Sequence, residues 1–242
     1  MVKKFEVLAI IPSRFGSKRI PYKNIKNFLG KPLISYAIKQ ALSVPFINRV
    51  IVDTESPKIA KIALKYGAEV PFLRPAELAT DKAQAVNSFL HLLKRLDVEE
   101  GYKPTHVIIL QTTSPLREQE DIEKCWQLMQ ESDATTVLTV CPTNPRFYHL
   151  SPKNDLILVN GSEKQSTNTQ EWEPGFILNG CFVYIVKVEA LLKEKVVITK
   201  NTKVVVCPKW RSVDLDTPEE WVMGEVLYKN KKKIKANLKI FL

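Results

Sequence analysis

The sequence has no Cys-x-x-Cys pair, and its four cysteines lie far apart, at Cys125, Cys141, Cys181 and Cys207. This spacing argues against a zinc site or a disulfide framework and predicts reduced, mostly buried thiols. No segment approaches the roughly 18 apolar residues that a membrane-spanning helix needs, and residues 1–6 hold no apolar stretch of signal-peptide length. We therefore expect a cytoplasmic protein without a membrane span.

Length and composition are those of an ordinary globular chain. The 242 residues, 45% hydrophobic and 26% charged, predict one α/β domain over residues 1–242. A loosely patterned stretch at about 142–180 predicts an excursion from it, and residues 229–242 form a basic tail. The net charge of +10 suits nucleic acid, an anionic membrane surface or anionic small substrates. Because the cations concentrate in the tail and in the loop of residues 14–31, two separate causes are indicated.

The loop that follows the first apolar run carries an unusual concentration of positive charge. Val7 to Ile11 has the length and β-branched content of a buried strand, and it stops at Pro12. Four cations then surround Gly16 at Arg14, Lys18, Arg19 and Lys23. The spacings GxxxxGK[ST] and GxGxxG are both missing. The loop is typical of a triphosphate cradle at the carboxyl end of a parallel strand, and its alternative interpretation is a solvated basic loop.

Hydrophobic periodicity predicts alternating helices and strands along most of the chain. Helices are expected over residues 33–42, 58–66, 83–96, 118–130, 188–193 and 218–228. Strands are expected over residues 49–53, 70–73, 106–110, 133–141, 156–159, 181–186, 196–198 and 204–206. The repeated strand–helix–strand order is the pattern of a parallel sheet covered on both faces.

Gln111 and the pair Asp214 and Asp216 each have two competing interpretations. Gln111, at the end of a predicted central strand, offers an amide that could read a pyrimidine edge, although the turn after it also caps a helix. Asp214 and Asp216 lie on one side of an extended segment, about 7 Å apart by the strand rise, which suits Mg²⁺ with phosphate as co-ligand. Their alternative is a helix start with Asp216 or Thr217 as N-cap, which leaves Asp214 unexplained. Asp81 is interpreted as the N-cap of the helix over 83–96.

The loop resembles the N-terminal signature of the sugar-acid cytidylyltransferases, above all the CMP-sialic acid synthetases, also called acylneuraminate cytidylyltransferases. The shared letters are Ile11-Pro12, Arg14, Ser17-Lys18 and Lys23-Asn24, with Ser13 in place of an alanine. Further blocks of the same family match at residues 74–81, 111–117, 179–180 and 214–216. Within 111–117, Thr112 is the only departure.

The resemblance implies a three-layer Rossmann-like nucleotidyltransferase fold with a mainly parallel central sheet and a small dimerisation and sugar-binding excursion. It implies Mg²⁺-dependent transfer of CMP from CTP to the anomeric hydroxyl of a sialic-acid-like nonulosonic acid, with release of pyrophosphate, by a homodimer. The variants are another sugar acid, legionaminic, pseudaminic or 3-deoxy-octulosonic. An alternative of another class is a basic module that binds RNA or an acidic surface; the favoured interpretation has no nucleic-acid partner.

The resemblance also assigns roles to individual residues. The catalytic group comprises Arg14, Lys18, Lys23 and Asp216. The nucleotide-binding group comprises Arg14, Ser17, Lys18, Asn24, Arg74, Gln111 and Thr113. The sugar-acid group comprises Gln111, Arg117, Gln170 and Asn179, and the metal ligands are Asp214 and Asp216.

The match is weakest where the family binds the sugar acid. An Arg-Gln pair is expected at Thr169-Gln170, but the arginine is missing, and Ile177 stands where a basic residue is common. Arginine is a strong bidentate partner for a carboxylate, so this departure puts the identity of the acceptor in doubt. Arg146 and Lys164 are the candidate replacements, and nothing in the sequence selects between them.

Overall fold

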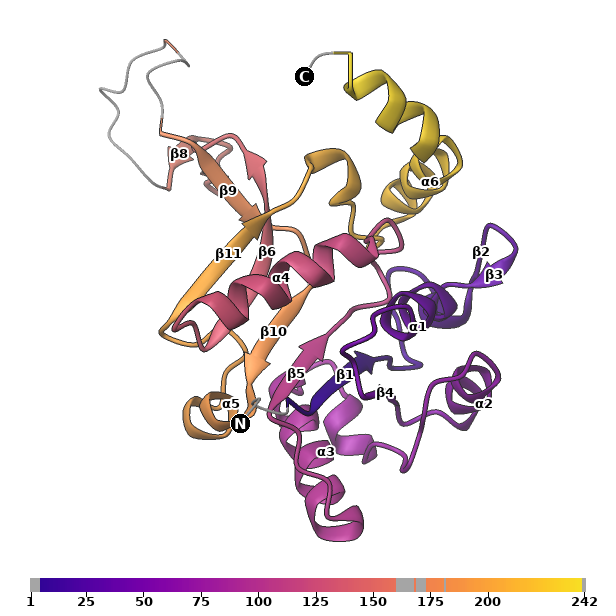
Figure 1. Cartoon of the computed structure of the whole chain (residues 1–242). Helices are drawn as coiled ribbons and strands as arrows, with labels where there is room; N and C mark the ends of the chain where they lie inside the picture. Colours follow the sequence, from indigo (N-terminus) through magenta and orange to yellow (C-terminus); the bar gives the residue numbers. More distant parts are fainter. Residues whose placement is uncertain (1–4, 160–167, 169–172, 181, 241–242) are drawn as a thin grey trace.

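A mixed sheet of seven strands forms the centre of the molecule (Figure 1). The computed structural model describes residues 5–159, 168, 173–180 and 182–240. The strands run in the order β11-β6-β10-β5-β1-β4, and β9 pairs with β6. Their bounds are β1 Val7–Pro12, β4 Arg49–Asp53, β5 His106–Ile109, β6 Thr136–Thr143, β9 Gly175–Leu178, β10 Tyr184–Lys187 and β11 Thr202–Val206. Only β9 and β10 run antiparallel to their neighbours, so the sheet is mainly parallel, as predicted.

Helices cover both faces of this sheet. Their bounds are α1 Ile34–Leu42, α2 Pro57–Lys65, α3 Ala85–Glu100, α4 Gln119–Glu131, α5 Val188–Glu194 and α6 Pro218–Leu238. One buried cluster joins α1, α2 and α4 to the sheet through side chains such as Ile11 and Ile38. A second cluster joins α3 and α5 to the opposite face through side chains such as Ile10 and Leu96. The three layers arise because alternate residues of the buried strands point to opposite faces.

Local signals in the sequence predicted several elements well. Strand β4 has the predicted bounds, and Ser56 caps α2 by accepting a hydrogen bond from the backbone N–H of Ile59. Two predicted strands are wrong. Residues 70–73 form no strand; the preceding residue, Glu69, makes a single bridge to Ile51. The pairing does not continue because Pro71 has no N–H to donate. Residues 196–198 form bends, with Val196 and Ile198 facing solvent.

The basic tail does not begin a separate segment. Helix α6 continues through the lysine run to Leu238, because lysine is a good helix former and no glycine or proline interrupts it. Its first turns are anchored by the buried Trp221 and Gly224, and Lys235 pairs with Glu118 at 2.6 Å. No helix among the described residues is long and apolar enough to cross a membrane.

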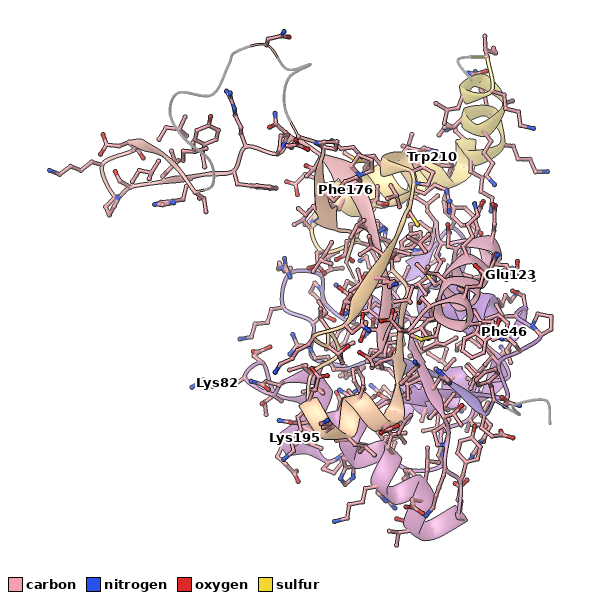
Figure 2. The ribbon with its side chains drawn as sticks, turned by 60° about the vertical axis from the view of Figure 1, so that its left-hand side comes forward. Phe46, Lys82, Glu123, Phe176, Lys195 and Trp210 are labelled. Atoms are coloured by element: carbon pink, nitrogen blue, oxygen red, sulfur yellow. The ribbon has the colours of Figure 1, made fainter. Side chains whose placement is uncertain are left out.

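Residues 142–180 leave the body of the sheet. The hairpin of β7 (Tyr148–Leu150) and β8 (Leu156–Leu158) stands clear of the layers (Figure 2), while β9 returns to pair with β6. Its exposed apolar side chains include Tyr148, Leu150, Leu156, Val159 and Phe176. This arm therefore presents an apolar surface to the outside.

Candidate active site

A pocket of about 520 Å³ opens at the carboxyl ends of β1 and β5. Its walls come from four parts of the chain: the loop of residues 12–24, the segment of residues 74–85, the turn of residues 111–113, and Asp216. Residues that lie far apart in the sequence meet here because parallel strands deliver their following loops to one edge of the sheet. The basic loop and the acidic pair were predicted to share one site, and the structure brings Arg14 and Asp216 together.

The basic loop is tied to its neighbours by buried hydrogen bonds. The backbone N–H of Ser13 donates to Asp53 O at 2.9 Å, and Asn24 Nδ2 donates to Arg14 O at 2.8 Å. Thr112 Oγ1 donates to Asn24 Oδ1 at 2.5 Å. Asn24 therefore links the loop after β1 to the turn after β5. Both polar atoms of the Asn24 side chain are thus hydrogen-bonded within the protein. The predicted contact of Asn24 with nucleotide stays a prediction.

The cations of the loop are divided between two carboxylates. Arg14 Nη1 lies 2.6 Å from Asp81 Oδ1, and Lys18 Nζ lies 2.5 Å from Asp81 Oδ2. Lys23 Nζ lies 2.5 Å from Asp216 Oδ1, and Arg19 Nη2 lies 2.6 Å from Asp216 Oδ2. Burial alone would raise the pKa of Asp216, but Lys23 and Arg19 keep that pKa below its usual value. Asp216 is thus held ionised in the pocket.

Asp214 lies deeper than Asp216 and has a different environment. Burial raises the pKa of Asp214, while a hydrogen bond with Thr113 opposes the rise. Its Oδ1 is buried and has no hydrogen-bond partner among the described residues. Gly180, at φ +67°, lies so close that a Cβ built on it would be 2.7 Å from Asp214 Oδ2. The backbone N–H of Leu215 donates to Thr113 O at 2.9 Å and holds the acidic segment against the turn after β5.

These features fit a divalent cation. No cluster of three or more His, Cys, Asp and Glu side chains suited to a metal occurs within the described part of the chain, so a cation held by Asp214 and Asp216 would take its further ligands from phosphate and water. A buried carboxylate oxygen without a partner, beside a second ionised carboxylate, is stabilised when a cation joins them. Mg²⁺ prefers oxygen ligands and commonly completes its coordination with phosphates and water.

Arg74 and Gln111 line the same pocket as the basic loop. Arg74 Nη2 lies 2.7 Å from both Asp53 O and Asp53 Oδ2, in a largely buried ion pair. Gln111 Oε1 accepts a hydrogen bond from Thr113 Oγ1 at 3.4 Å. Arg74 is therefore fixed at the pocket wall, and the Gln111 amide nitrogen is available to a ligand in the cavity. Thr113 and Ser17 also line the pocket.

Two residues predicted to touch the sugar acid have other partners. Arg117 is only 2% exposed; its guanidinium donates to Gln40 Oε1, to Gln111 O and to Phe182 O. Asn179, 3% exposed, accepts from Thr139 Oγ1 and donates to Ser212 Oγ, both at 3.0 Å. Neither lines the pocket, because buried hydrogen bonds with the fold already use their polar groups. Arg117 thus holds Gln111 at the pocket, whereas Asn179 joins β6 to the segment before Asp214. Gln170, like Thr169, lies outside the described residues.

Sequence reasoning missed four residues of the site. Asp81 was taken as a helix cap, but α3 begins at Ala85 after Gln84, and Asp81 instead holds Arg14 and Lys18. Arg19 was seen only as one of several cations. Ser13 and Thr112 were noted as departures from the family; Ser13 Oγ is buried at the pocket without a partner among the described residues, and Thr112 supports Asn24. For Ser13 and Thr112, the difference from the family pattern was the feature of the sequence that could have pointed to the site.

The pocket therefore belongs to a nucleotide-binding transferase by its fold and by its charges. The profile of the cytidylyltransferase family matches residues 8–171. The chain is 32% identical over 225 residues to the CMP-N,N'-diacetyllegionaminic acid synthase of Legionella pneumophila, covering 91% of this chain and 95% of that protein. It is 30% identical to a pseudaminic acid cytidylyltransferase of Campylobacter jejuni, covering 92% and 96%. The chain belongs to the cytidylyltransferase family and is a nucleotidyltransferase.

A solved structure supports the same fold. The CMP:2-keto-3-deoxy-manno-octonic acid synthetase in complex with CTP superposes with a TM-score of 0.67, covering 93% of this chain and 99% of that chain, at 15% identity. The predicted Rossmann-like nucleotidyltransferase fold is thereby confirmed. Family membership also settles the choice between an enzyme and a basic binding module in favour of the enzyme.

Proposed function

We propose that this protein transfers CMP from CTP to the anomeric hydroxyl of a nonulosonic acid and releases pyrophosphate. The observation that carries the proposal is the meeting of the basic loop with Asp216 in one pocket, through the contacts of Lys23 and Arg19 with that carboxylate. Cations for a polyphosphate and carboxylates for a divalent metal are the two groups of opposite charge that this chemistry requires.

The reaction is an in-line displacement at the α-phosphorus of CTP. The anomeric oxygen forms a bond to that phosphorus, and the bond from the α-phosphorus to the bridging oxygen of the β-phosphate breaks. The electron pair leaves with pyrophosphate, and the hydroxyl proton passes to solvent. Arg14, Lys18 and Lys23 stabilise the negative charge that develops on the departing pyrophosphate, while Ser17 at the pocket edge supplies a polar contact.

Asp214 and Asp216 would hold Mg²⁺. The ion, when bound, neutralises charge on the phosphate oxygens and favours ionisation of the attacking hydroxyl. Asp216 is kept ionised by its two cationic neighbours, and Asp214 contributes the buried oxygen described above. Lys23, with its side chain 15% exposed, is the more buried of those neighbours and lies where metal, phosphate and carboxylate charges would meet.

Base recognition is assigned to the wall that Arg74, Gln111 and Thr113 form. An amide presents one donor and one acceptor side by side, which suits the edge of cytosine. Because Asp53 holds the Arg74 guanidinium at 2.7 Å, that side chain is preorganised for a ribose or base oxygen. No histidine among the described residues lines the pocket. His106, whose pKa is lowered to about 4 mainly by burial, packs against the rings of Phe5 and Trp126.

The names of the two relatives narrow the choice of sugar acid that would accept CMP. Legionaminic and pseudaminic acids appear in their names, and both belong to the same nine-carbon class as sialic acid. Pyrophosphate release should be measured with CTP and Mg²⁺ against a panel of N,N'-diacetyllegionaminic, pseudaminic, N-acetylneuraminic and 3-deoxy-manno-octulosonic acids. We expect turnover with a nine-carbon acid, at least about tenfold faster with the preferred one, because a site that pairs polar groups of its substrate rejects analogues lacking them. Release of pyrophosphate with none of the four acids would contradict the proposal.

A homodimer is also proposed. The arm formed by β7, β8 and β9 exposes Leu150 and Leu156, each more than 60% accessible, together with Val159 and Phe176. Contiguous apolar surface of this kind marks interfaces, and the predicted excursion lies here. Sedimentation should give about twice the chain mass of 27.6 kDa, and Leu150→Lys with Leu156→Lys should shift it toward one chain. Val98→Lys, at an exposed position on α3, is the control.

We also propose that the protein acts in the cytoplasm, since the buried, unpaired thiols of Cys125 and Cys207 suit a reducing compartment.

A further inference from the structure

Asp81 pairs with two of the three cations assigned to the triphosphate, Arg14 and Lys18. Its Oδ1 takes Arg14 at 2.6 Å, and its Oδ2 takes Lys18 at 2.5 Å. Each carboxylate oxygen thus binds one cation, much as two oxygens of a phosphate would. The two hydrogen bonds lower the pKa of Asp81, so its negative charge persists at neutral pH.

The two ion pairs of Asp81 are exposed to solvent, so a ligand can replace the carboxylate in them. The side chains of Arg14, Lys18 and Asp81 are 39%, 80% and 42% exposed, and ion pairs in water contribute little to stability. The Lys23 contact with Asp216 differs, because the lysine side chain is only 15% exposed. Asp216 is therefore held by a largely buried partner, whereas Asp81 and its partners are open to solvent.

The turn that carries Asp81 has few ties to the body. It lies between the 3₁₀ turn Ala76–Ala79 and α3, and it has the backbone hydrogen bond from Ala83 N to Thr80 O at 3.2 Å. The side chain of Lys82, the next residue, points out at the edge of the molecule (Figure 2). None of residues 80–84 is buried, so the turn can shift without opening the core.

We propose that Asp81 is a built-in competitor for the triphosphate, which holds Arg14 and Lys18 when the nucleotide site is empty and returns to them as pyrophosphate departs. This inference rests on the proposed function. A ligand must replace the carboxylate before it gains the two cations, so small anions of low charge bind poorly. The same carboxylate favours release of pyrophosphate after the transfer, because it offers the cations another partner.

The test is Asp81→Asn, which keeps the shape of the side chain and removes its charge. Inorganic pyrophosphate is the probe, and its dissociation constant is measured by calorimetry on the full chain without sugar acid. We expect Asp81→Asn to bind pyrophosphate about three- to tenfold more tightly, the scale expected for loss of two exposed ion pairs. In steady-state assays the inhibition constant for pyrophosphate should fall by a similar factor, and the KM for CTP should fall with it.

Asp97→Asn is the matched control. Asp97 also lies in a solvent-exposed ion pair, with Lys103 at 3.1 Å, and lines no part of the active-site pocket. It removes the same charge from the protein, so an equal gain in both variants would show a general effect of net charge and overturn the inference. Unchanged or weaker pyrophosphate binding by Asp81→Asn would overturn it as well, since Asp81 would then only position the loop. The proposed function is judged separately, by product formation with the sugar-acid panel, so the two can fail independently.

Discussion

Asp216→Ala is expected to reduce the rate of turnover by about a thousandfold or more. CTP should still bind to this variant in the absence of divalent metal. Asp216 lines the pocket and is the partner of Lys23 and Arg19. Its removal deletes a proposed metal ligand, and stabilisation of charge in the transition state is commonly worth this much. The same change frees two cations, so nucleotide binding without metal should survive or become tighter.

The measurement is pyrophosphate release with the preferred sugar acid, with Mg²⁺ and with the metal removed by a chelator. CTP affinity is measured by calorimetry in the chelated buffer. Asp133→Ala is the control, because Asp133 is 77% exposed, pairs with Lys203 at the surface and does not line the pocket. Wild-type protein should lose turnover on chelation and regain it with Mg²⁺. Magnesium-dependent turnover retained by Asp216→Ala would show that the metal assignment is wrong.

Gly180→Ala is expected to reduce kcat by about a hundredfold or more. A methyl group there would lie 2.7 Å from Asp214 Oδ2 and 2.9 Å from its Cγ, which is closer than nonbonded atoms approach. Asp214 cannot withdraw easily, because Leu215 is fully buried and its N–H is bonded to Thr113 O. The carboxylate would have to rotate away from the place where it faces Asp216, and catalytic groups tolerate little displacement.

Gly101→Ala separates this collision from backbone strain. Gly101 has φ +64°, close to the +67° of Gly180, but a Cβ there would meet no heavy atom within 4 Å. Both variants pay a similar cost for alanine in the left-handed region, of about 1 kcal/mol, which urea unfolding would measure. Turnover should fall only in Gly180→Ala. Equal turnover in the two variants would mean that the position of Asp214 does not matter for the reaction.

Much of the fold could be predicted because its signals are local. Ser56-Pro57 and Gly67 mark the ends of α2 by capping chemistry that involves neighbours in the sequence. The apolar run before Pro12 gave β1 because a strand buried on both faces needs no polar alternation. Helix α6 was predicted too short because the pattern was judged by its apolar residues, whereas lysines continue a helix equally well.

Several residues of the site could be predicted from the sequence, but the contacts between distant residues could not. The Asp214–Asp216 motif and the loop cations were found from residue type and spacing. Asp81 meets Arg14 across 67 positions in the chain, and no local pattern encodes such a contact. Arg117 was assigned to the sugar acid from its charge, and its burial could not be predicted from the sequence. Inside the protein a guanidinium can be satisfied by carbonyl oxygens and an amide, as Phe182 O, Gln111 O and Gln40 do here.

The contact between Lys23 and Asp216 spans 193 positions of the sequence and has a consequence for biosynthesis. During translation the strand β1 and its loop emerge early, and domains begin to fold from the amino-terminal side. The carboxylates that would hold the metal emerge only after every strand of the main sheet has been made. A ribosome-bound chain that ends before residue 214 would carry the cations of the loop but neither of the proposed metal ligands, so activity should arise only after both carboxylates have been made.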